Sequence, residues 1–209
     1  LKKIHIPSTV TAIGGYCFER CSGLEEVTFA DDSKLETIAV KTFFDPVLYG
    51  SGLKKITIPK SVKYIQDSAF SWCNGLKSVT FEPGSGLTTV ALNAFLDCDN
   101  LTIYCSDEDE DAKKALSKVV SSDKIKSLAP TVTFDVDGTV IAKQNAKDHN
   151  FKAVKPENPT KKGYVLTDWC TKNADNEYKP FDFTTTVTED ITLYAQWEEL
   201  PDHQLTVIG

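Results

Sequence analysis

The sequence has no methionine, only three histidines and no long apolar run. Because a complete translation product begins with methionine, we expect a mature or truncated fragment, in which a missing signal peptide says nothing about location. Every apolar run is shorter than the roughly 18 residues that a membrane-spanning helix needs. These absences predict a fragment without a membrane span.

The charge is unevenly distributed along the chain. The net charge is -7, and residues 131–209 contribute -5, against -1 from residues 1–105. This shift predicts a domain boundary near residue 130. An acidic chain repels phosphate backbones and anionic lipids, which argues against nucleic acids and membrane surfaces as partners. Hydrophobic residues make up 41% of the chain, which is enough for packed cores.

The first 105 residues repeat one pattern of apolar residues. Each unit opens with a leucine and continues with five further apolar positions, which in the first unit are Leu1, Ile4, Ile6, Val10, Ile13 and Phe18. Later units open at Leu24, Leu53, Leu76 and Leu101, and their extra length falls only at 30–34, 45–52 and 82–86. Loops inserted at fixed points are typical of a stacked solenoid, in which each unit buries its apolar edge against the next.

Each unit is predicted to contain a strand, a return segment and a turn. Ile4 and Ile6 alternate with polar residues, which is the pattern of a strand with one buried face. Pro7 ends this strand because proline lacks a ladder donor. Residues 10–13 then return the chain, and 16–21 are predicted to form a short helical turn over the back. The equivalent helical turns are expected at 68–73 and 93–98.

This pattern, Leu-x-x-Ile-x-Ile-Pro-x-x-Val-x-x-Ile-x-x-x-x-Phe-x-x-Cys, resembles the BspA-like leucine-rich repeats of bacterial surface antigens. The resemblance covers residues 1–105, although the second unit has Pro46 where the pattern has cysteine. It implies a secreted or cell-surface protein, often one that adheres to host proteins or other cells. Because Leu1 already lies inside a repeat, we expect the stack to continue upstream of it.

Three of the six cysteines occupy one column of the repeat: Cys21, Cys73 and Cys98. A column of small, buried, apolar thiols fits this position. An even cysteine count in a secreted protein leaves disulfides as the alternative. Cys17 and Cys21 are four residues apart, but without histidine partners this spacing does not predict a metal site.

Residues 106–130 are predicted to form a helical cap and a linker. Residues 101–105 have the pattern of a last strand, and Ser106 is a suitable N-cap for a helix that begins with acidic residues and continues with Lys113, Lys114 and Lys118. The acidic run could instead bind calcium, but it lacks the glycine and the spaced ligands of a calcium loop. Residues 121–130, which end in Pro130, are predicted to be a short linker.

Residues 131–198 are predicted to form a small β-rich module with about five short strands and an aromatic core. The segment 133–140 matches the first motif of haloacid-dehalogenase-type phosphatases, in which Asp135 would be the nucleophile, Asp137 the general acid and Mg²⁺ the cofactor. That chemistry needs a helix directly after the motif, in a doubly wound sheet. The residues that follow instead indicate hairpins, so we interpret Asp137 and Gly138 as a turn between two strands.

The module resembles the internalin-type B-repeat, also called the Listeria–Bacteroides repeat. The match runs through residues 132–135, Gly138, 155–164, Trp169 and 191–197. It implies a compact β-grasp-like module that serves as a spacer or interaction unit in surface proteins. Residues 199–209 are predicted to be a tail. The predicted fold class is therefore mainly β with short helices: a leucine-rich-repeat solenoid (1–105) with a helical cap (106–130), followed by a β-grasp-like module (131–198).

Exposed positions on the first strand of each unit form two candidate binding columns. The columns are Lys3, Glu26, Lys55 and Ser78 on the one hand and His5, Thr28, Thr57 and Thr80 on the other. Repeat proteins bind partners through such faces, although a solvated polar face without a partner is the alternative. Trp72, on the back of its unit, is the tryptophan most expected to be exposed and is a second candidate contact.

The leading hypothesis is a non-catalytic binding or adhesion fragment of an extracellular or cell-surface bacterial protein. Its partner would be a host or matrix protein, a glycan or another cell-surface molecule, and a monomer without cofactor, metal or catalytic residues is expected. A purely structural stalk is the second hypothesis. A Mg²⁺-dependent phosphatase that uses Asp135 and Asp137 is the remote third.

Overall fold

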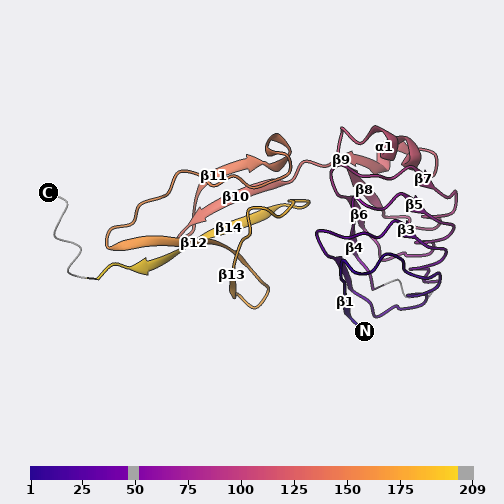
Figure 1. Cartoon of the computed structure of the whole chain (residues 1–209), viewed down its shortest axis with the longest axis horizontal. Helices are drawn as coiled ribbons and strands as arrows, with labels where there is room; N and C mark the ends of the chain where they lie inside the picture. The colour runs from indigo at the N-terminus through magenta and orange to yellow at the C-terminus, as the bar shows by residue number, and fades with distance from the viewer. Residues whose placement is uncertain (47–51, 202–209) are drawn as a thin grey trace. The chain divides into compact units, whose positions relative to one another are not determined.

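The computed structural model describes residues 1–46 and 52–201. The chain divides into two compact units, Leu1–Leu128 and Ala129–Gly209, and each is described by itself (Figure 1). The first is a solenoid of parallel strands and the second a small β-sheet module. The predicted fold class, mainly β with short helices, is confirmed.

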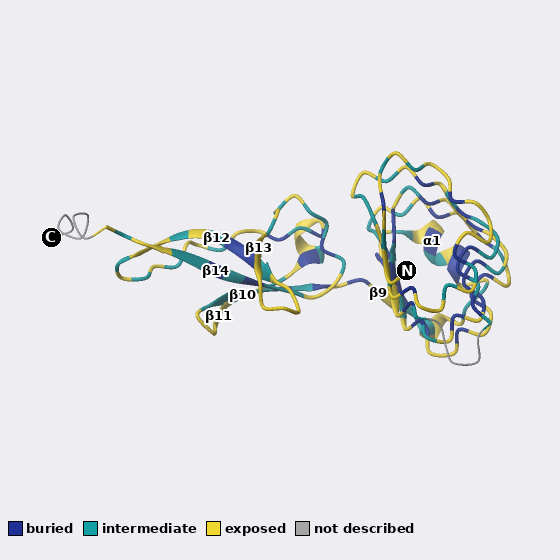
Figure 2. Cartoon of the chain, turned by 90° about the horizontal axis from the view of Figure 1, so that it is seen from below, coloured by how far each residue is buried: buried dark blue, intermediate teal, exposed yellow. Residues whose placement is uncertain are grey.

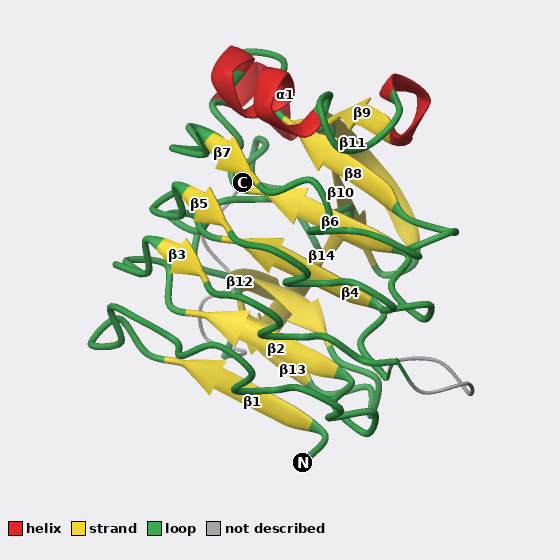
Figure 3. Cartoon of the chain, turned by 90° about the vertical axis from the view of Figure 1, so that its right-hand side faces the viewer, coloured by secondary structure: helices red, strands yellow, loops and turns green. Residues whose placement is uncertain are grey.

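One side of the solenoid is formed by the strands that open the repeat units (Figure 3). All are parallel to their neighbours: β1 pairs with β2, and four further strands form a sheet in the order β4-β6-β8-β9. The strands are β1 (Lys3–Ile6), β2 (Glu26–Phe29), β4 (Lys55–Ile58), β6 (Ser78–Phe81), β8 (Thr102–Cys105) and β9 (Ile125–Ser127). Each repeat unit makes one coil, and coils 1 to 5 begin at Leu1, Leu24, Leu53, Leu76 and Leu101.

A second, narrower parallel sheet forms the return side. It contains β3 (Thr37–Ile38), β5 (Tyr64–Ile65) and β7 (Thr89–Val90), and a bridge between Ile13 and Ile38 continues it into coil 1.

The third side of the solenoid is made of turns, so the predicted helical turns at 16–21, 68–73 and 93–98 are wrong. Tyr16 and Trp72 have positive φ angles of 63° and 64°, which no right-handed helix contains. Alternate backbone amides donate to the next coil: Phe43 N lies 2.8 Å from Ala69 O, and Phe70 N lies 2.8 Å from Ala94 O. The amides between them close turns within their own coil, as Ser71 N does with Ser68 O at 3.1 Å. Hydrogen bonds between coils thus alternate with turn bonds within one coil along this side of the solenoid.

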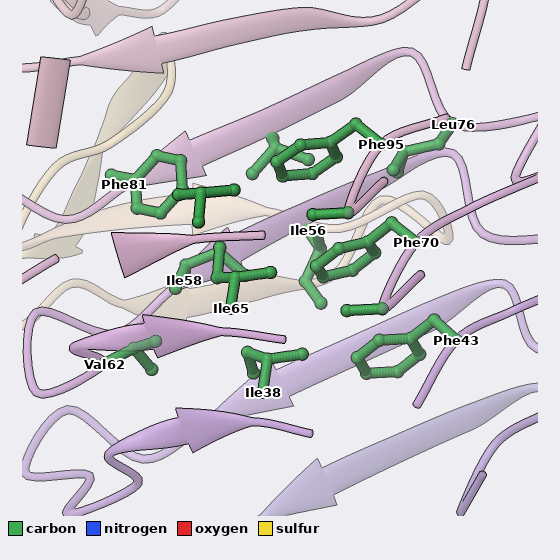
Figure 4. Close-up of a cluster of buried hydrophobic side chains, with 14 of the residues drawn as sticks. Ile38, Phe43, Ile56, Ile58, Val62, Ile65, Phe70, Leu76, Phe81 and Phe95 are labelled. Carbon is green, nitrogen blue, oxygen red and sulfur yellow. The ribbon is translucent and has the colours of Figure 1, made fainter. Parts of the chain in front are cut away.

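The interior between the three sides is filled by the predicted apolar columns (Figures 2 and 4). Ile56 and Val79 are buried, and Ile4 at the first coil is half-buried against the same core. The phenylalanines of coils 1 to 4 stack as a ladder with ring centroids 5.4, 5.1 and 5.3 Å apart. The prediction that these side chains line a shared interior is confirmed.

A helix and an added strand complete the solenoid after coil 5. Helix α1 (Glu110–Leu116) begins after Asp109 and not after Ser106, which is buried, and α1 has no side-chain cap. Its Ala112 and Leu116 are buried in the solenoid core, so the helix covers the interior as predicted. The predicted linker 121–130 is wrong for most of its length. It contains the 3-10 helix η1 (Ser122–Lys124) and β9, because β9 pairs with the otherwise open edge of β8.

The second unit is a five-stranded sheet in the order β11-β10-β14-β12-β13. Its elements are β10 (Thr131–Val136), β11 (Thr139–Asn145), the 3-10 helix η2 (Ala146–His149), β12 (Tyr164–Lys172), β13 (Tyr178–Pro180) and β14 (Ile191–Glu199). The central pair β10–β14 is parallel and the other pairs are antiparallel. Phe134 and Trp169 anchor the core, with their rings edge to face at 5.0 Å. Of the predicted tail, Glu199 belongs to β14, and 202–209 lie outside the described residues.

Candidate binding face on the solenoid strands

The structure places the two predicted columns side by side on the outer surface of the first sheet. In the first column Lys3 pairs with Glu26, and Lys55 pairs with Ser78. In the second column the pairs are His5 with Thr28 and Thr57 with Thr80. Neighbours across a β-ladder lie roughly 4.8 Å apart, so each pair presents a continuous polar surface. We call these outward positions of the strands the strand face.

The side chains of coils 1 and 2 on this face contact one another. The Lys3 ammonium lies 2.7 Å from a Glu26 carboxylate oxygen, and His5 Nδ1 lies 3.0 Å from the Thr28 hydroxyl. The hydrogen bond to Glu26, followed by its negative charge, raises the pKa of Lys3 above the ordinary value. Because both partners are exposed, such a pair contributes little to stability.

The strand face extends beyond the predicted residues to Thr102, Tyr104 and Lys126. Ser78 pairs with Thr102, Thr80 with Tyr104, and Tyr104 with Lys126 on β9. Coil 5 has one residue fewer than coil 4 between its leading leucine and the first buried residue of its strand. As a result Ile103, and not Tyr104, pairs with Val79. The alternation of polar and apolar residues in 102–105 is the signal that could have identified these positions.

The turn side carries exposed aromatic residues as well. Trp72 is 42% exposed, as predicted, and its backbone amide donates to Leu96 O at 2.8 Å. In the first two coils the Lys41 ammonium lies 5.6 Å from the Tyr16 ring centre and 5.0 Å from that of Phe44. Each of these rings is supported by the scaffold, but they are spread over separate coils.

The repeat cysteines are structural thiols in the two coils where their surroundings are complete. Cys73 Sγ donates to Phe43 O at 2.9 Å, and Cys98 Sγ donates to Phe70 O at 3.0 Å. Burial raises the pKa of the Cys98 thiol, and likewise that of Cys105, to about 12. Cys21 is only half-buried and Cys17 is exposed, and all six cysteines are free thiols. The predicted thiol column is therefore confirmed for Cys73 and Cys98.

The phosphatase-like motif forms a β-hairpin turn. Asp137 and Gly138 have φ angles of 51° and 87° and connect β10 directly to the antiparallel strand β11, the geometry of a two-residue hairpin. A carboxylate oxygen of Asp135 accepts from the Gly138 amide at 2.8 Å, and Asp137 forms a 2.8 Å ion pair with Lys161. The turn interpretation is confirmed. The phosphatase hypothesis fails on its context, because a strand stands where that chemistry needs a helix.

The acidic run before α1 is used for local contacts. Asp107 accepts from the Ser127 hydroxyl at 2.7 Å, and Asp109 accepts from the Gly84 amide at 3.1 Å. Within residues 1–46 and 52–201, no three His, Cys, Asp or Glu side chains are grouped so that they could hold a metal ion. In the same ranges no helix has the length and apolarity to cross a membrane.

Comparison with known proteins identifies two repeat families. Residues 1–109 match the model of the BspA type leucine rich repeat region, and residues 131–196 match that of the Listeria-Bacteroides repeat domain. The crystal structure of a leucine rich cell surface protein from Faecalibacterium prausnitzii A2-165 is similar to 58% of this chain at 24% identity, with a TM-score of 0.47. The match covers 30% of that protein, so the chain spans less than a third of its length.

Proposed function

The chain belongs to the family of BspA-type leucine-rich repeat proteins, and from this premise we propose that it is a non-catalytic binding module of a bacterial cell-surface or secreted protein. Its partner, a molecule of a host or neighbouring cell or of the extracellular matrix, contacts the strand face. The module acts as a monomer outside the cell. Family membership supports the surface location, and the in-register strand face supports the site.

The observation that carries the proposal is the contrast between the two surfaces of the same strands. The inward residues are apolar and buried, and in coils 3 and 4 Ile56, Ile58, Val79 and Phe81 are at most 2% exposed. The outward residues are polar, and the parallel ladders hold them in register on a rigid backbone. Binding loses less conformational entropy when the contacting groups are already ordered. A rigid polar array is therefore a suitable recognition surface.

The experiment compares two triple variants in binding to a panel of immobilised matrix proteins and host-cell glycans. The strand-face variant is Thr28→Gln, Thr57→Gln and Thr80→Gln, which adds bulk to one column without changing charge. The control variant is Thr9→Gln, Thr11→Gln and Thr89→Gln, at exposed positions on the other sides of the solenoid. We expect the strand-face variant to bind at least tenfold more weakly and the control to bind like the parent.

Two outcomes would contradict this proposal. Equal losses in both variants would show that contact does not occur through the strand face. Failure of the parent chain to bind any member of the panel would favour a structural stalk.

A further inference from the structure

Trp72 stands at an exposed position of the turn side where the backbone does not favour it. Its side chain is 42% exposed, and its φ angle is 64°. Left-handed backbone favours glycine, asparagine and aspartate and disfavours bulky side chains. The same repeat position, two residues after the ladder phenylalanine, has φ angles of 55° at Arg20 and 58° at Asp97. Neither the backbone geometry nor the filling of the core therefore requires a tryptophan in coil 3.

The register between coils 3 and 4 places Asp97 beside Trp72. Phe70 and Phe95 stack across these coils with ring centroids 5.3 Å apart (Figure 4), and the Trp72 amide donates to Leu96 O at 2.8 Å. Trp72 and Asp97 each follow their phenylalanine by two residues, so they lie opposite each other at a ladder spacing of roughly 4.8 Å. Both are exposed and share the left-handed backbone. We call Trp72, Leu96 and Asp97 the turn-side site.

The carboxylate of Asp97 has no ion-pair partner in the described part of the chain. No basic side chain of residues 1–46 and 52–201 lies within ion-pair distance of it. Lys124 contacts the same turn, but its ammonium group donates to the carbonyl oxygens of Cys98 and Asp99, at 3.4 and 3.0 Å. Asp99 is exposed and adds a second carboxylate. Lys124 balances one of the two carboxylates, so a negative charge remains beside the exposed indole ring.

In coils 1 and 2 the aromatic rings of the same side are already paired with a cation. The Lys41 ammonium lies 5.6 Å from the ring centre of Tyr16 and 5.0 Å from that of Phe44. Among the residues that the structure describes, no ammonium or guanidinium group lies over the Trp72 ring. Tryptophan attracts a cation to its face more strongly than the other aromatic residues do. A cation for Trp72 has to come from another molecule.

We propose that the turn-side site binds an arginine side chain of a partner protein, with the guanidinium plane stacked on the Trp72 indole and its N–H groups directed at the Asp97 carboxylate. Arginine fits better than lysine because its planar group stacks on aromatic faces and pairs with a carboxylate through two parallel hydrogen bonds. Leu96, which is 49% exposed, offers apolar surface to the methylene groups of that arginine. The site goes beyond the proposed function, because it lies on the turn side and not on the strand face.

The test titrates the whole isotope-labelled chain with a blocked hexapeptide that contains two arginines among glycines and serines, followed by nuclear magnetic resonance. The comparison ligands are the same peptide with citrulline, the uncharged analogue of arginine, and the neutral oligosaccharide maltohexaose. The indole N–H resonance of Trp72, identified by its loss in Trp72→Asn, reports on the site.

Three further variants separate the charge of the site from the charge of the chain. Asp97→Asn removes the carboxylate and keeps a residue that tolerates left-handed backbone. Its matched control is Asp32→Asn, which removes one exposed charge in the loop after β2. Tyr16→Asn removes another exposed ring of the turn side, at a φ angle of 63° and already paired with Lys41. Circular dichroism melting of each variant verifies folding.

We expect the arginine peptide to shift the Trp72 resonance until it saturates, and the citrulline peptide to leave it unchanged. The dissociation constant should rise at least fivefold in Asp97→Asn, and it should rise with salt as the charges are screened. It should change less than twofold in Asp32→Asn and in Tyr16→Asn. The threonine variant of the strand face should bind the peptide like the parent, since the two surfaces lie on different sides of the solenoid.

Several results would overturn the site. No saturable shift with the arginine peptide, or an equal shift with the citrulline peptide, would show that the ring does not recognise the cation. Equal weakening in Asp97→Asn and Asp32→Asn would show unselective attraction to an acidic chain. A saturable shift with maltohexaose that persists in Asp97→Asn would assign the ring to a sugar instead of an arginine.

Discussion

The phenylalanine ladder offers the most direct test of the solenoid, because its members differ in their number of ring neighbours. Phe70 is fully buried, and its ring lies 5.1 Å from that of Phe43 and 5.3 Å from that of Phe95, with interplanar angles of 13° and 7°. Phe18 contacts one ring of the ladder, Phe43 at 5.4 Å, and is 9% exposed. Replacing each by leucine removes the ring and keeps an apolar side chain.

The expected losses of unfolding free energy follow from these contacts. An aromatic pair contributes about 0.5–1.5 kcal/mol beyond the area it buries. Phe70→Leu removes two pairs and leaves part of the ring volume empty, so we expect a loss of about 2–3 kcal/mol. Phe18→Leu removes one pair beside a partly open site, for a loss of about 1 kcal/mol. Because both substitutions are chemically identical, the difference between the two losses reports the contribution of the second ring neighbour.

Urea unfolding followed by far-ultraviolet circular dichroism measures both variants. Because the chain has two units, hydrogen exchange of peptides from residues 60–100 assigns the affected transition to the solenoid. Equal losses at the two positions would refute the reasoning, because they would show that ring neighbours along the stack do not contribute. A loss below about 1 kcal/mol at Phe70 would contradict the buried ladder itself.

Three further predictions concern the thiols and the hairpin. In the native protein a thiol reagent should modify Cys17 first and Cys21 more slowly, and the denatured, unreduced protein should show six thiols; fewer would indicate disulfides. Because burial raises the pKa of Cys98 and Cys105 from 9.0 to about 12, the folded state keeps protons that the unfolded state loses above pH 9. The free energy of unfolding should therefore fall between pH 9 and 12 by about 1 kcal/mol per thiol per pH unit. Urea titrations at several pH values measure this slope, which should be smaller in Cys98→Ala. Gly138→Val should destabilise the second unit by about 1–2 kcal/mol, because the φ angle of Gly138 is 87°. Asp137→Asn is the control and should be tolerated. A thermal melt measures both, and an unchanged melting temperature in Gly138→Val would contradict the turn geometry.

The strands and the core could be predicted because their signal is local. Alternation in Ile4-His5-Ile6 separates the buried face from the exposed one, and the recurrence of phenylalanine places the ladder without any knowledge of tertiary contacts. The turn side could not be predicted in the same way. A helical turn and a pair of turns with left-handed residues share the spacing of their apolar positions. What distinguishes them is the acceptor of alternate amides, which lies on the next coil.

Strand β9 could not be predicted for a related reason. Its three residues contain one apolar side chain, Ile125, between polar neighbours, which is too short a pattern to indicate a strand. It forms because β8 would otherwise present an open edge and because Ile125 packs on the core. The start of α1 differs for a local reason, because the buried Ser106 hydroxyl accepts from the Glu108 amide at 3.4 Å and the helix begins only after Asp109.

The residues of the candidate binding face could be predicted only in part, because the strand register decides which side chains are neighbours and the repeat pattern alone does not. Alignment of the units by their leading leucines finds the columns of coils 1 to 4 but leaves coil 5 out of step by one residue, because Leu101 aligns with Lys77. The ladder instead places Tyr104 beside Thr80 and Lys126 beside Tyr104. These two residues extend a column of threonines by a phenol and a terminal ammonium group. The chemistry of the face is thus determined by which residues the backbone hydrogen bonds align. A one-residue slip in that alignment would point Tyr104 into the core and Ile103 toward solvent.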